Sequence, residues 1–119
     1  MNEVRISGRL SREPEVRQLE NTTLAVAPLV INDGYKTPTG EHREATTFVD
    51  VQLWGEDATR VAALKKGQEV QFIGSLRQRQ WEDRETGVKR TKLYVKAWEW
   101  EAIERKAVEQ AKDAPGMER

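Results

Sequence analysis

The middle of the chain, residues 46–81, reads TTFVDVQLWGEDATRVAALKKGQEVQFIGSLRQRQW. Apolar and polar residues alternate in Thr46–Trp54 and again in Val70–Trp81, a pattern typical of half-buried β-strands. Between them, Asp57–Lys66 has apolar residues at helical spacing, and Gly67 follows as a typical helix-ending residue. The stretch therefore predicts a strand, a short helix and a long second strand with Val70, Phe72, Gly74 and Leu76 on its core face.

The flanking segments supply three more strands. They are Val4–Leu10, the apolar run Leu24–Ile31, in which Pro28 indicates a bulge or an edge, and Arg90–Ile103, which follows a hairpin loop at Glu82–Lys89. Ser11–Thr23 is predicted as a loop with a short paired piece around Val16, Asp33–Gly40 as a long polar loop, and Ala102–Lys112 as a helix. Five strands with one helix between the third and fourth favour an all-β, OB-type Greek-key barrel. Residues 1–103 are expected to form this domain and residues 104–119 a short helical or flexible tail.

The composition excludes several classes of protein. The chain has 119 residues, 20 basic and 20 acidic, with one His and no Cys, which fits a single domain without a disulfide or a thiolate zinc site. His42 lies in a polar stretch and is interpreted as a solvated loop residue. No apolar run approaches the ~20 residues that span a bilayer, and charged residues interrupt the amino terminus where a signal peptide would be apolar. We expect a cytoplasmic protein that is not an enzyme and has no metal, cofactor, membrane or small-molecule partner.

Aromatic side chains lie on the polar side of two predicted strands. Phe48 and Trp54 share their face with polar residues, and Trp81 lies beside Arg77 and Arg79. Flat exposed rings can each stack an unpaired base for ~1–3 kcal/mol without regard to sequence. The alternative is that the tail or another subunit covers the rings.

Basic residues are concentrated in two segments although the net charge is zero. One segment runs from Arg77 to Lys96, and the other holds Arg5, Arg9, Arg12 and Arg17. Because arginines share a face with Trp81, a basic groove that follows a nucleic-acid backbone is favoured over simple solvated strand faces.

Four segments match a known family in order and spacing. They are NEVRISGRL (residues 2–10), REPEVR (12–17), VQLWGEDATRVAALKKGQEVQFIGSL (51–76) and LRQRQWEDRETG (76–87). Together they resemble the bacterial and phage single-stranded DNA-binding proteins, the SSB family, over about residues 2 to 103. The resemblance implies an OB fold that coats single-stranded DNA with little sequence preference during replication, recombination or repair, usually as a homotetramer.

The resemblance also implies roles for single residues. Tyr35, Phe48, Trp54 and Trp81 stand at the family's base-stacking positions, and Arg17, Lys66, Arg77 and Arg79 match basic positions of its DNA path. With the charge pattern added, the candidate cations are Arg5, Arg9, Arg17, Lys36, Lys66, Arg77, Arg79, Lys89 and Arg90.

The chain departs from the family at several points. Val49 replaces a His associated with subunit contacts and Asp50 replaces an Arg on the DNA path, so a dimer is the alternative to the tetramer. The family's long linker and acidic tip are absent, so recruitment of enzymes through that tip is not expected, and a phage, plasmid or accessory paralogue fits the short form. The corresponding locations are the nucleoid or, for a phage protein, the host cytoplasm.

The sequence leaves alternatives to this function. A primosome-type accessory OB protein would bind single strands and protein partners as a dimer, and RNA is an alternative ligand. An OB hydrolase needs carboxylates that converge on a metal, whereas the acidic residues here are mostly isolated or next to Arg. One face of the last strand, with Lys92, Tyr94, Lys96, Trp98 and Trp100, is interpreted either as extra stacking surface or as a subunit or helix contact.

Overall fold

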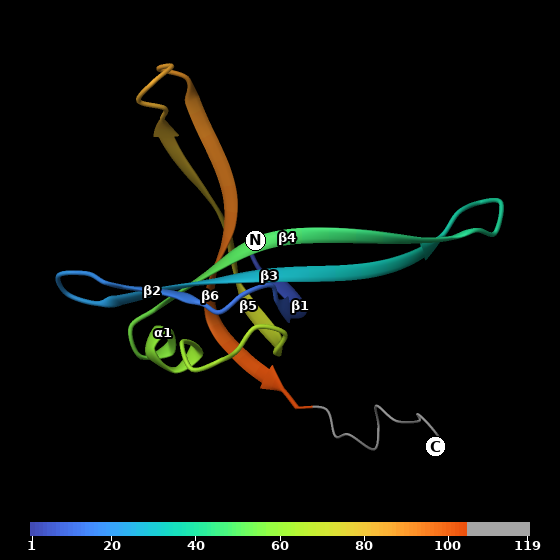
Figure 1. The fold of residues 1–119 in the computed structure, drawn as a ribbon, viewed down its shortest axis with the longest axis horizontal. Helices are drawn as coiled ribbons and strands as arrows, with labels where there is room; N and C mark the ends of the chain where they lie inside the picture. Colours follow the sequence, from blue (N-terminus) through green and yellow to red (C-terminus); the bar gives the residue numbers. More distant parts are fainter. Residues whose placement is uncertain (105–119) are drawn as a thin grey trace.

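A computed structural model describes residues 1–104 of the chain. In chain order the elements are β1 (Val4–Leu10), β2 (Glu15–Gln18), β3 (Thr23–Lys36), β4 (His42–Trp54), α1 (Glu56–Val61), β5 (Glu69–Glu82) and β6 (Lys89–Ile103). Figure 1 shows a small central body from which two long hairpins extend in different directions, with α1 packed below the crossing strands. Among residues 1–104, no helix has the length and apolar character needed to cross a membrane.

The strands close into a five-stranded barrel. β1 pairs antiparallel with β5, and its last two residues, Arg9 and Leu10, pair with β3. β5 pairs with β6, β6 meets β4 in a short parallel contact at Val51↔Val95, and β4 pairs with β3 along its length. The short strand β2 lies on the outer edge of β3, where a paired piece around Val16 was expected. The predicted OB-type barrel, with a helix between its third and fourth strands, is confirmed.

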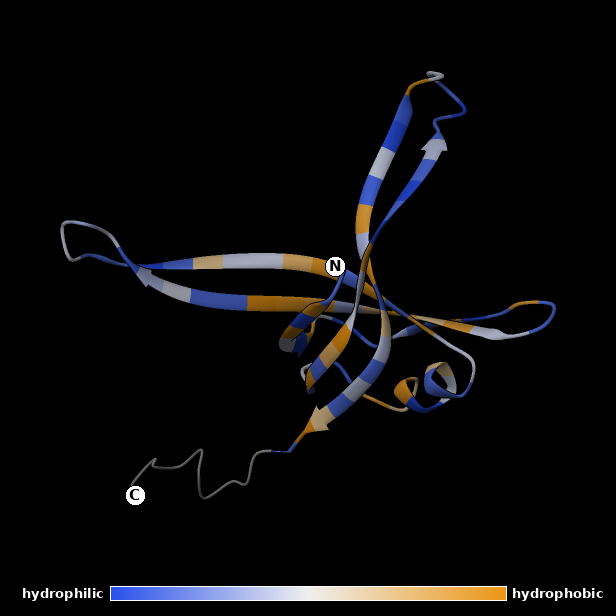
Figure 2. Cartoon of the chain, turned by 180° about the vertical axis from the view of Figure 1, so that it is seen from behind, coloured by the Kyte–Doolittle hydropathy of each residue, from blue (hydrophilic) through white to orange (hydrophobic). Residues whose placement is uncertain are grey.

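The barrel interior takes one set of apolar side chains from every barrel strand and from α1. The buried set is Leu10, Ala25, Ala27, Leu29, Val51, Leu53, Ala58, Val61, Val70, Phe72, Val95 and Ala97. Phe72, the largest of the fully buried side chains, contributes about 1.5–3 kcal/mol by leaving water. Apolar bands gather where the strands cross, and the hairpin ends are mostly polar (Figure 2). The barrel is therefore stabilised by apolar packing where the strands cross, and the polar hairpins project from this region.

A β-bulge in β6 changes which side chains face the core. The β5–β6 register shifts between Ile73↔Glu99 and Gly74↔Ala97, which leaves Trp98 without a partner on β5. A Cβ at Gly74 would lie only 2.2 Å from the Lys96 carbonyl oxygen, so the close approach at the bulge requires glycine. After the bulge the alternation is reversed, and Trp100 packs against the core, unlike Trp98. The expectation that both Trp side chains share one face of β6 is therefore wrong.

β5 leaves the barrel at Leu76. This side chain, expected in the core, is exposed because β5 has no barrel layer to cover it from this point on. The Asn2 side chain holds the strand here: its amide nitrogen donates to the Leu76 carbonyl at 2.9 Å, and its oxygen accepts from the Leu76 N–H at 2.8 Å. We call residues 76–94 the β5–β6 arm.

The long polar loop expected between Asp33 and Gly40 is mostly a second hairpin. β3 and β4 stay paired as far as Lys36↔His42, with only a short turn between them. Both faces of this hairpin are polar and exposed, so the sequence carries no alternation that would indicate strands. We call residues 32–48 the β3–β4 arm. Pro28 lies without a bulge opposite Asp50, at the point where the other edge of β3 passes from β2 to β1.

Helix predictions were accurate in position but not in length. α1 ends at Val61 because the next turns are tighter, with the N–H of Leu64 donating to the Val61 carbonyl. Gly67, with a φ of +90°, then directs its N–H to the Leu10 carbonyl at 2.8 Å and leads the chain into β5. The helix expected from Ala102 is wrong at its start because β6 continues to Ile103, and from residue 105 onward it lies outside the described residues.

Candidate nucleic-acid interface

The outward sides of β2, β3, β4, β5 and β6 form one continuous surface, which we call the central face. Val26 on β3, Gln52 on β4 and Lys96 on β6 are register partners across three neighbouring strands. The same sides carry Trp54 at one end and continue onto the β5–β6 arm, where Lys92 is the partner of Arg79. The central face therefore connects the barrel to the base of this arm.

At the barrel end of the central face, Trp54 is paired with a cation. The Lys96 ammonium lies 5.7 Å from the centre of the Trp54 ring, within the range of a cation–π contact. The ring is 37% exposed. Lys96 was not among the candidate cations, although its place on the polar side of the last strand was a signal for it.

On the β5–β6 arm, Trp81 has the same arrangement. The Arg79 guanidinium carbon lies 4.6 Å from the centre of the Trp81 ring. Beside the ring is a hollow of about 310 Å³, lined also by Lys89 and Arg90. Two of the expected rings therefore each carry a cation and remain accessible.

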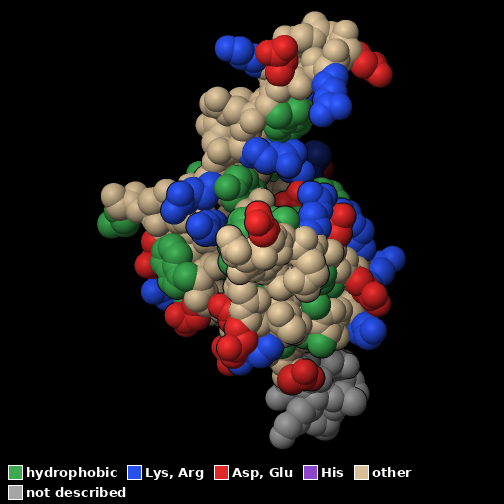
Figure 3. All heavy atoms as spheres, turned by 90° about the vertical axis from the view of Figure 1, so that its left-hand side faces the viewer, with side chains coloured by type: hydrophobic (Ala, Val, Ile, Leu, Met, Phe, Trp, Pro, Cys, Tyr) green, Lys and Arg blue, Asp and Glu red, His purple; other side chains and the backbone are tan. Residues whose placement is uncertain are grey.

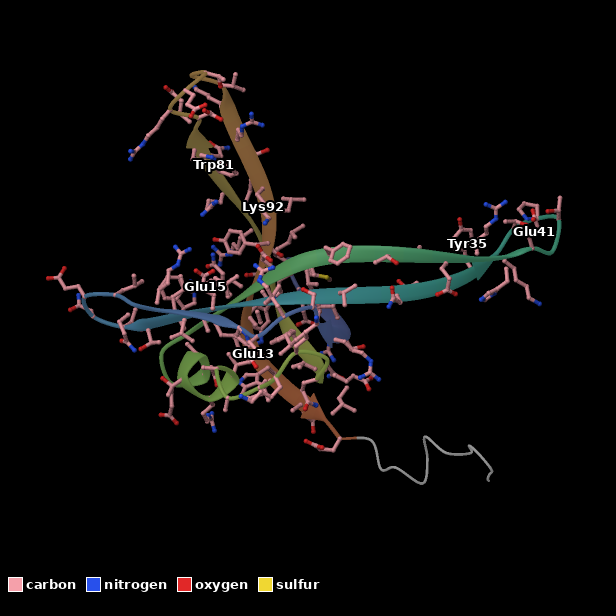
Figure 4. The ribbon with its side chains drawn as sticks, viewed as in Figure 1. Glu13, Glu15, Tyr35, Glu41, Trp81 and Lys92 are labelled. Carbon is pink, nitrogen blue, oxygen red and sulfur yellow. The ribbon has the colours of Figure 1, made fainter. Side chains whose placement is uncertain are left out.

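A second hollow, the central pocket, lies between these two ring–cation pairs. Its volume is about 190 Å³. It is lined by Arg12 from the loop before β2, Glu15 and Arg17 from β2, Leu24 and Val26 from β3, Asp50 and Gln52 from β4, Arg79 from β5, and Lys92 and Tyr94 from β6. Lys and Arg side chains gather at the base of the arm in Figure 3. In Figure 4, Glu15 and Lys92 lie on either side of the angle between β2 and the arm.

The other two expected rings lie on the β3–β4 arm. Tyr35 is far out on this arm, away from Trp81 (Figure 4). Phe48 lies nearer the barrel and, at 70% exposed, is the most exposed of the four rings. The structure thus places Trp54 and Trp81 on one surface and separates Tyr35 from them.

The candidate cations differ in whether an acidic group already holds them. Arg5, Arg9, Arg17 and Arg90 form ion pairs with Glu3, Glu69, Glu15 and Asp83. The hydrogen bond from Arg5 to Glu3 at 2.9 Å raises the pKa of this guanidinium. Arg77 donates to the Ser75 hydroxyl, whereas Lys36, Lys66 and Lys89 have no ion pair to another residue of 1–104.

The cations also differ in position. Arg5 and Arg9 lie on β1 and line neither of the two hollows beside the rings, and Lys66 lies in the loop after α1. Arg12 and Lys92, which do line the central pocket, were not among the candidates. The sequence had placed Arg12 in a basic segment and Lys92 on the polar face of the last strand, but their meeting in one pocket depends on a loop and on strand register.

The Trp81 hairpin has an ordered turn. Asp83 Oδ1 accepts hydrogen bonds from the N–H groups of Glu85 at 2.9 Å and Thr86 at 3.3 Å, and these bonds lower the pKa of the Asp83 carboxyl. Asp83 also lies 3.4 Å from Arg90, the register partner of Trp81. The carboxylate therefore ties the turn at the tip of the arm to β6, directly opposite Trp81 on β5.

Metal-ligating residues do not cluster within the described part of the chain. Residues 1–104 contain no group of three or more His, Asp or Glu side chains placed to hold a metal ion. His42 lies on the exposed β3–β4 arm, 3.3 Å from Glu44. The central face itself carries rings, cations and hydrogen-bonding groups.

Comparisons with known proteins agree with this geometry. The chain is 32% identical over 109 residues to the single-stranded DNA-binding protein of Deinococcus radiodurans, covering 90% of this chain and 36% of that protein. It is 31% identical over 103 residues to single-stranded DNA-binding protein 1 of a Synechocystis species, covering 81% and 78% of the two chains. The crystal structure of the Thermus aquaticus single-stranded DNA-binding protein superposes with a TM-score of 0.76 at 26% identity, covering 90% of this chain and 52% of that one.

The chain therefore spans about a third of the Deinococcus relative and about half of the Thermus chain. The model of the single-strand binding protein family matches residues 1–103. This match covers the whole barrel, both arms and the central face. The chain belongs to the single-strand binding protein family.

Proposed function

We propose that this protein binds and coats single-stranded DNA, with little dependence on sequence, through base stacking on Trp54 and Trp81. The observation that carries the proposal is the pairing of each ring with a cation on one surface, Lys96 over Trp54 and Arg79 over Trp81. The names of the relatives, which are single-stranded DNA-binding proteins, support the same conclusion. The proposed role is one of binding and protection and involves no catalytic step.

The two parts of each ring–cation pair have separate tasks. A ring stacks any unpaired base for ~1–3 kcal/mol, because every base has a π-face. The cation that lies over the ring in the free protein is then placed to contact the phosphates on either side of the base. In a duplex both faces of each base are covered by neighbouring base pairs, so the bases cannot stack on the rings and duplex DNA binds more weakly.

Phosphate contacts make the affinity depend on salt. For single strands, each neutralised phosphate contributes a slope of about −0.7 to the logarithmic dependence of affinity on salt. Many of the arginines are already paired with acidic residues, and exposed ion pairs of this kind exchange partners at a cost of about 0–1 kcal/mol. The neutral chain therefore relies more on its rings than a strongly basic protein would.

We further propose that the protein acts in the cytoplasm as a homo-oligomer, with a tetramer as the expected form. Mass measurement in solution distinguishes the tetramer from the dimer. Nothing in the comparisons favours an accessory protein of the primosome type.

A titration of the intrinsic fluorescence tests the main proposal. Adding oligo(dT) quenches tryptophan emission and duplex DNA of the same length quenches it less, while raising the salt concentration weakens both. Trp54→Ala and Trp81→Ala each remove part of the quenching and weaken binding. A preference for duplex DNA, or full affinity in both variants, contradicts the proposal.

A further inference from the structure

The central pocket contains polar side chains that have no side-chain partner within residues 1–104. Among residues 1–104, the Arg12 guanidinium, the Gln52 amide and the Tyr94 hydroxyl make no side-chain hydrogen bond or ion pair. Elsewhere on the surface, most arginines are held by a nearby carboxylate. Gln52 and Tyr94 are half-buried, and Arg12 is exposed at the rim. Binding becomes more favourable when a ligand supplies hydrogen bonds that half-buried polar groups lack. The pocket thus has the properties of a site for a polar ligand.

One ion pair in the pocket presents an acceptor beside a donor. The Lys92 ammonium donates to Asp50 Oδ2 at 2.8 Å. The second carboxylate oxygen, Oδ1, has no hydrogen bond within the described residues, and the ammonium retains further N–H donors. The pair can therefore accept one hydrogen bond and donate another at neighbouring positions.

The Watson–Crick edge of every DNA base has the matching pattern. Thymine presents its N3–H beside O4, cytosine its amino group beside N3, adenine its amino group beside N1, and guanine its N1–H beside O6. Proteins read such edges in unpaired bases, because in a duplex the partner strand already occupies them. An acceptor and a donor side by side therefore recognise that a base is unpaired without selecting which base it is.

We propose that the central pocket seats one unpaired base of the bound strand, with its Watson–Crick edge against the Asp50–Lys92 pair and its plane beside Tyr94. Arg12 and Arg79 are placed to contact the adjoining phosphates. This inference rests on the proposed function and adds to it a site that distinguishes single strands from duplex by hydrogen bonding as well as by stacking.

A nucleic-acid strand fits this pocket better than a second protein chain does. The pocket lies between the two ring–cation pairs, with Arg79 belonging to both the pocket and the Trp81 contact, so a strand that stacks on Trp54 and Trp81 crosses it. Four of its lining side chains are cationic and two are acidic, which suits a polyanion. The walls are mostly polar, unlike the apolar centre of a stable subunit interface.

The test compares oligo(dT) with an oligonucleotide of equal length made of N3-methylthymidine. Methylation at N3 keeps the charge and the stacking face of each base but removes the N3–H donor. The wild-type protein is expected to bind the methylated strand roughly tenfold more weakly, the loss expected for a hydrogen bond to a charged group. In Asp50→Ala, the two strands bind equally. Asp33→Ala removes a carboxylate from the β3–β4 arm instead and serves as the matched control, retaining the wild-type ratio.

The outcomes separate this inference from the proposed function. Equal affinity of the wild-type protein for the two strands overturns the base-reading pocket and leaves stacking on Trp54 and Trp81 intact; a pocket covered by a second copy of the chain gives this result. If Asp50→Ala still binds oligo(dT) about tenfold more tightly than the methylated strand, the base-reading pocket is also overturned. Failure to bind oligo(dT) at all overturns the proposed function itself.

Discussion

The two hairpin arms look alike in outline and differ in how their charges are arranged. On the β5–β6 arm, Arg79 lies over Trp81, and Lys92 faces the central pocket at the base. On the β3–β4 arm, Arg43 is paired with Glu41, and His42 lies beside Glu44. Tyr35 is the register partner of Arg43, so its neighbouring cation is already engaged. We therefore expect an exposed ring to bind nucleic acid more strongly when its cation is available to a phosphate.

The arms also differ at their bases. The β3–β4 ladder runs from Leu24↔Trp54 to Lys36↔His42 without a shift in register. The β5–β6 arm is preceded by a bulge in the barrel, with Gly74 against β6, and its first residue, Leu76, is bound by the Asn2 side chain. The arm that carries the cation-paired ring is thus the one whose direction is fixed by specific contacts.

The largest expected difference between the arms is in DNA affinity. Trp81→Ala removes a ring proposed to stack a base and should weaken oligo(dT) binding by about 5- to 150-fold, corresponding to ~1–3 kcal/mol. Tyr35→Ala should weaken it by about threefold or less, because the register partner of this ring, Arg43, is already paired with Glu41. Fluorescence anisotropy of a labelled oligonucleotide measures both, and equal losses would contradict the distinction between the arms.

The second difference between the arms concerns how much a Gly→Ala substitution in each hairpin should lower the free energy of unfolding. In Gly74→Ala, the new Cβ would lie 2.2 Å from the Lys96 carbonyl oxygen and 2.7 Å from Ala97 Cα, both backbone atoms that cannot move aside alone. The expected loss is about 1–3 kcal/mol of unfolding free energy. In Gly34→Ala, the nearest atoms belong to the His42 and Glu44 side chains, which can rotate away, and the change should stay within about 0.5 kcal/mol.

Urea unfolding of both glycine variants measures this difference. If Gly34→Ala lost as much unfolding free energy as Gly74→Ala, the close backbone contact at the bulge would not be the cause of the loss.

The smallest effect concerns the tip of the β5–β6 arm at low pH. The folded-state pKa of Asp83 is lowered, so the stability that it gives to the turn is present above its unfolded pKa of about 3.9 and is lost as the pH falls through the folded value. The amide NMR signals of Glu85 and Thr86 should shift over that acidic range. The Glu41 amide, in the turn of the other arm, is bound by the Thr37 hydroxyl and has no titrating acceptor. In Asp83→Asn the acid-dependent shifts should disappear, and their persistence would assign them to another group.

Much of the barrel could be predicted because one side of each strand is buried. Val49, Val51 and Leu53 alternate with outward residues, and this alternation located β4 and placed Trp54 outside. The β3–β4 arm was not predicted, since both of its faces are solvated and its residues carry no periodic signal. Trp100 was placed on the wrong face because a bulge leaves no mark in the order of residues.

The candidate site was predictable ring by ring but not as a surface. Trp54 and Trp81 are recognisable from their outward positions, whereas the contact of Lys96 with Trp54 depends on a parallel pairing between strands far apart in the chain. Arg12 reaches the central pocket from a loop. Such cross-strand neighbours follow from register, which the sequence determines only through the complete fold.

Asn2 makes two hydrogen bonds with the Leu76 backbone, one donated and one accepted, as a neighbouring strand would. A single side chain near the start of the chain therefore helps to fix the base of the β5–β6 arm, 74 residues away in sequence. Because Asn2 lies next to the amino terminus, a tag fused there adds bulk beside these hydrogen bonds, and an untagged protein is the appropriate control in any binding measurement.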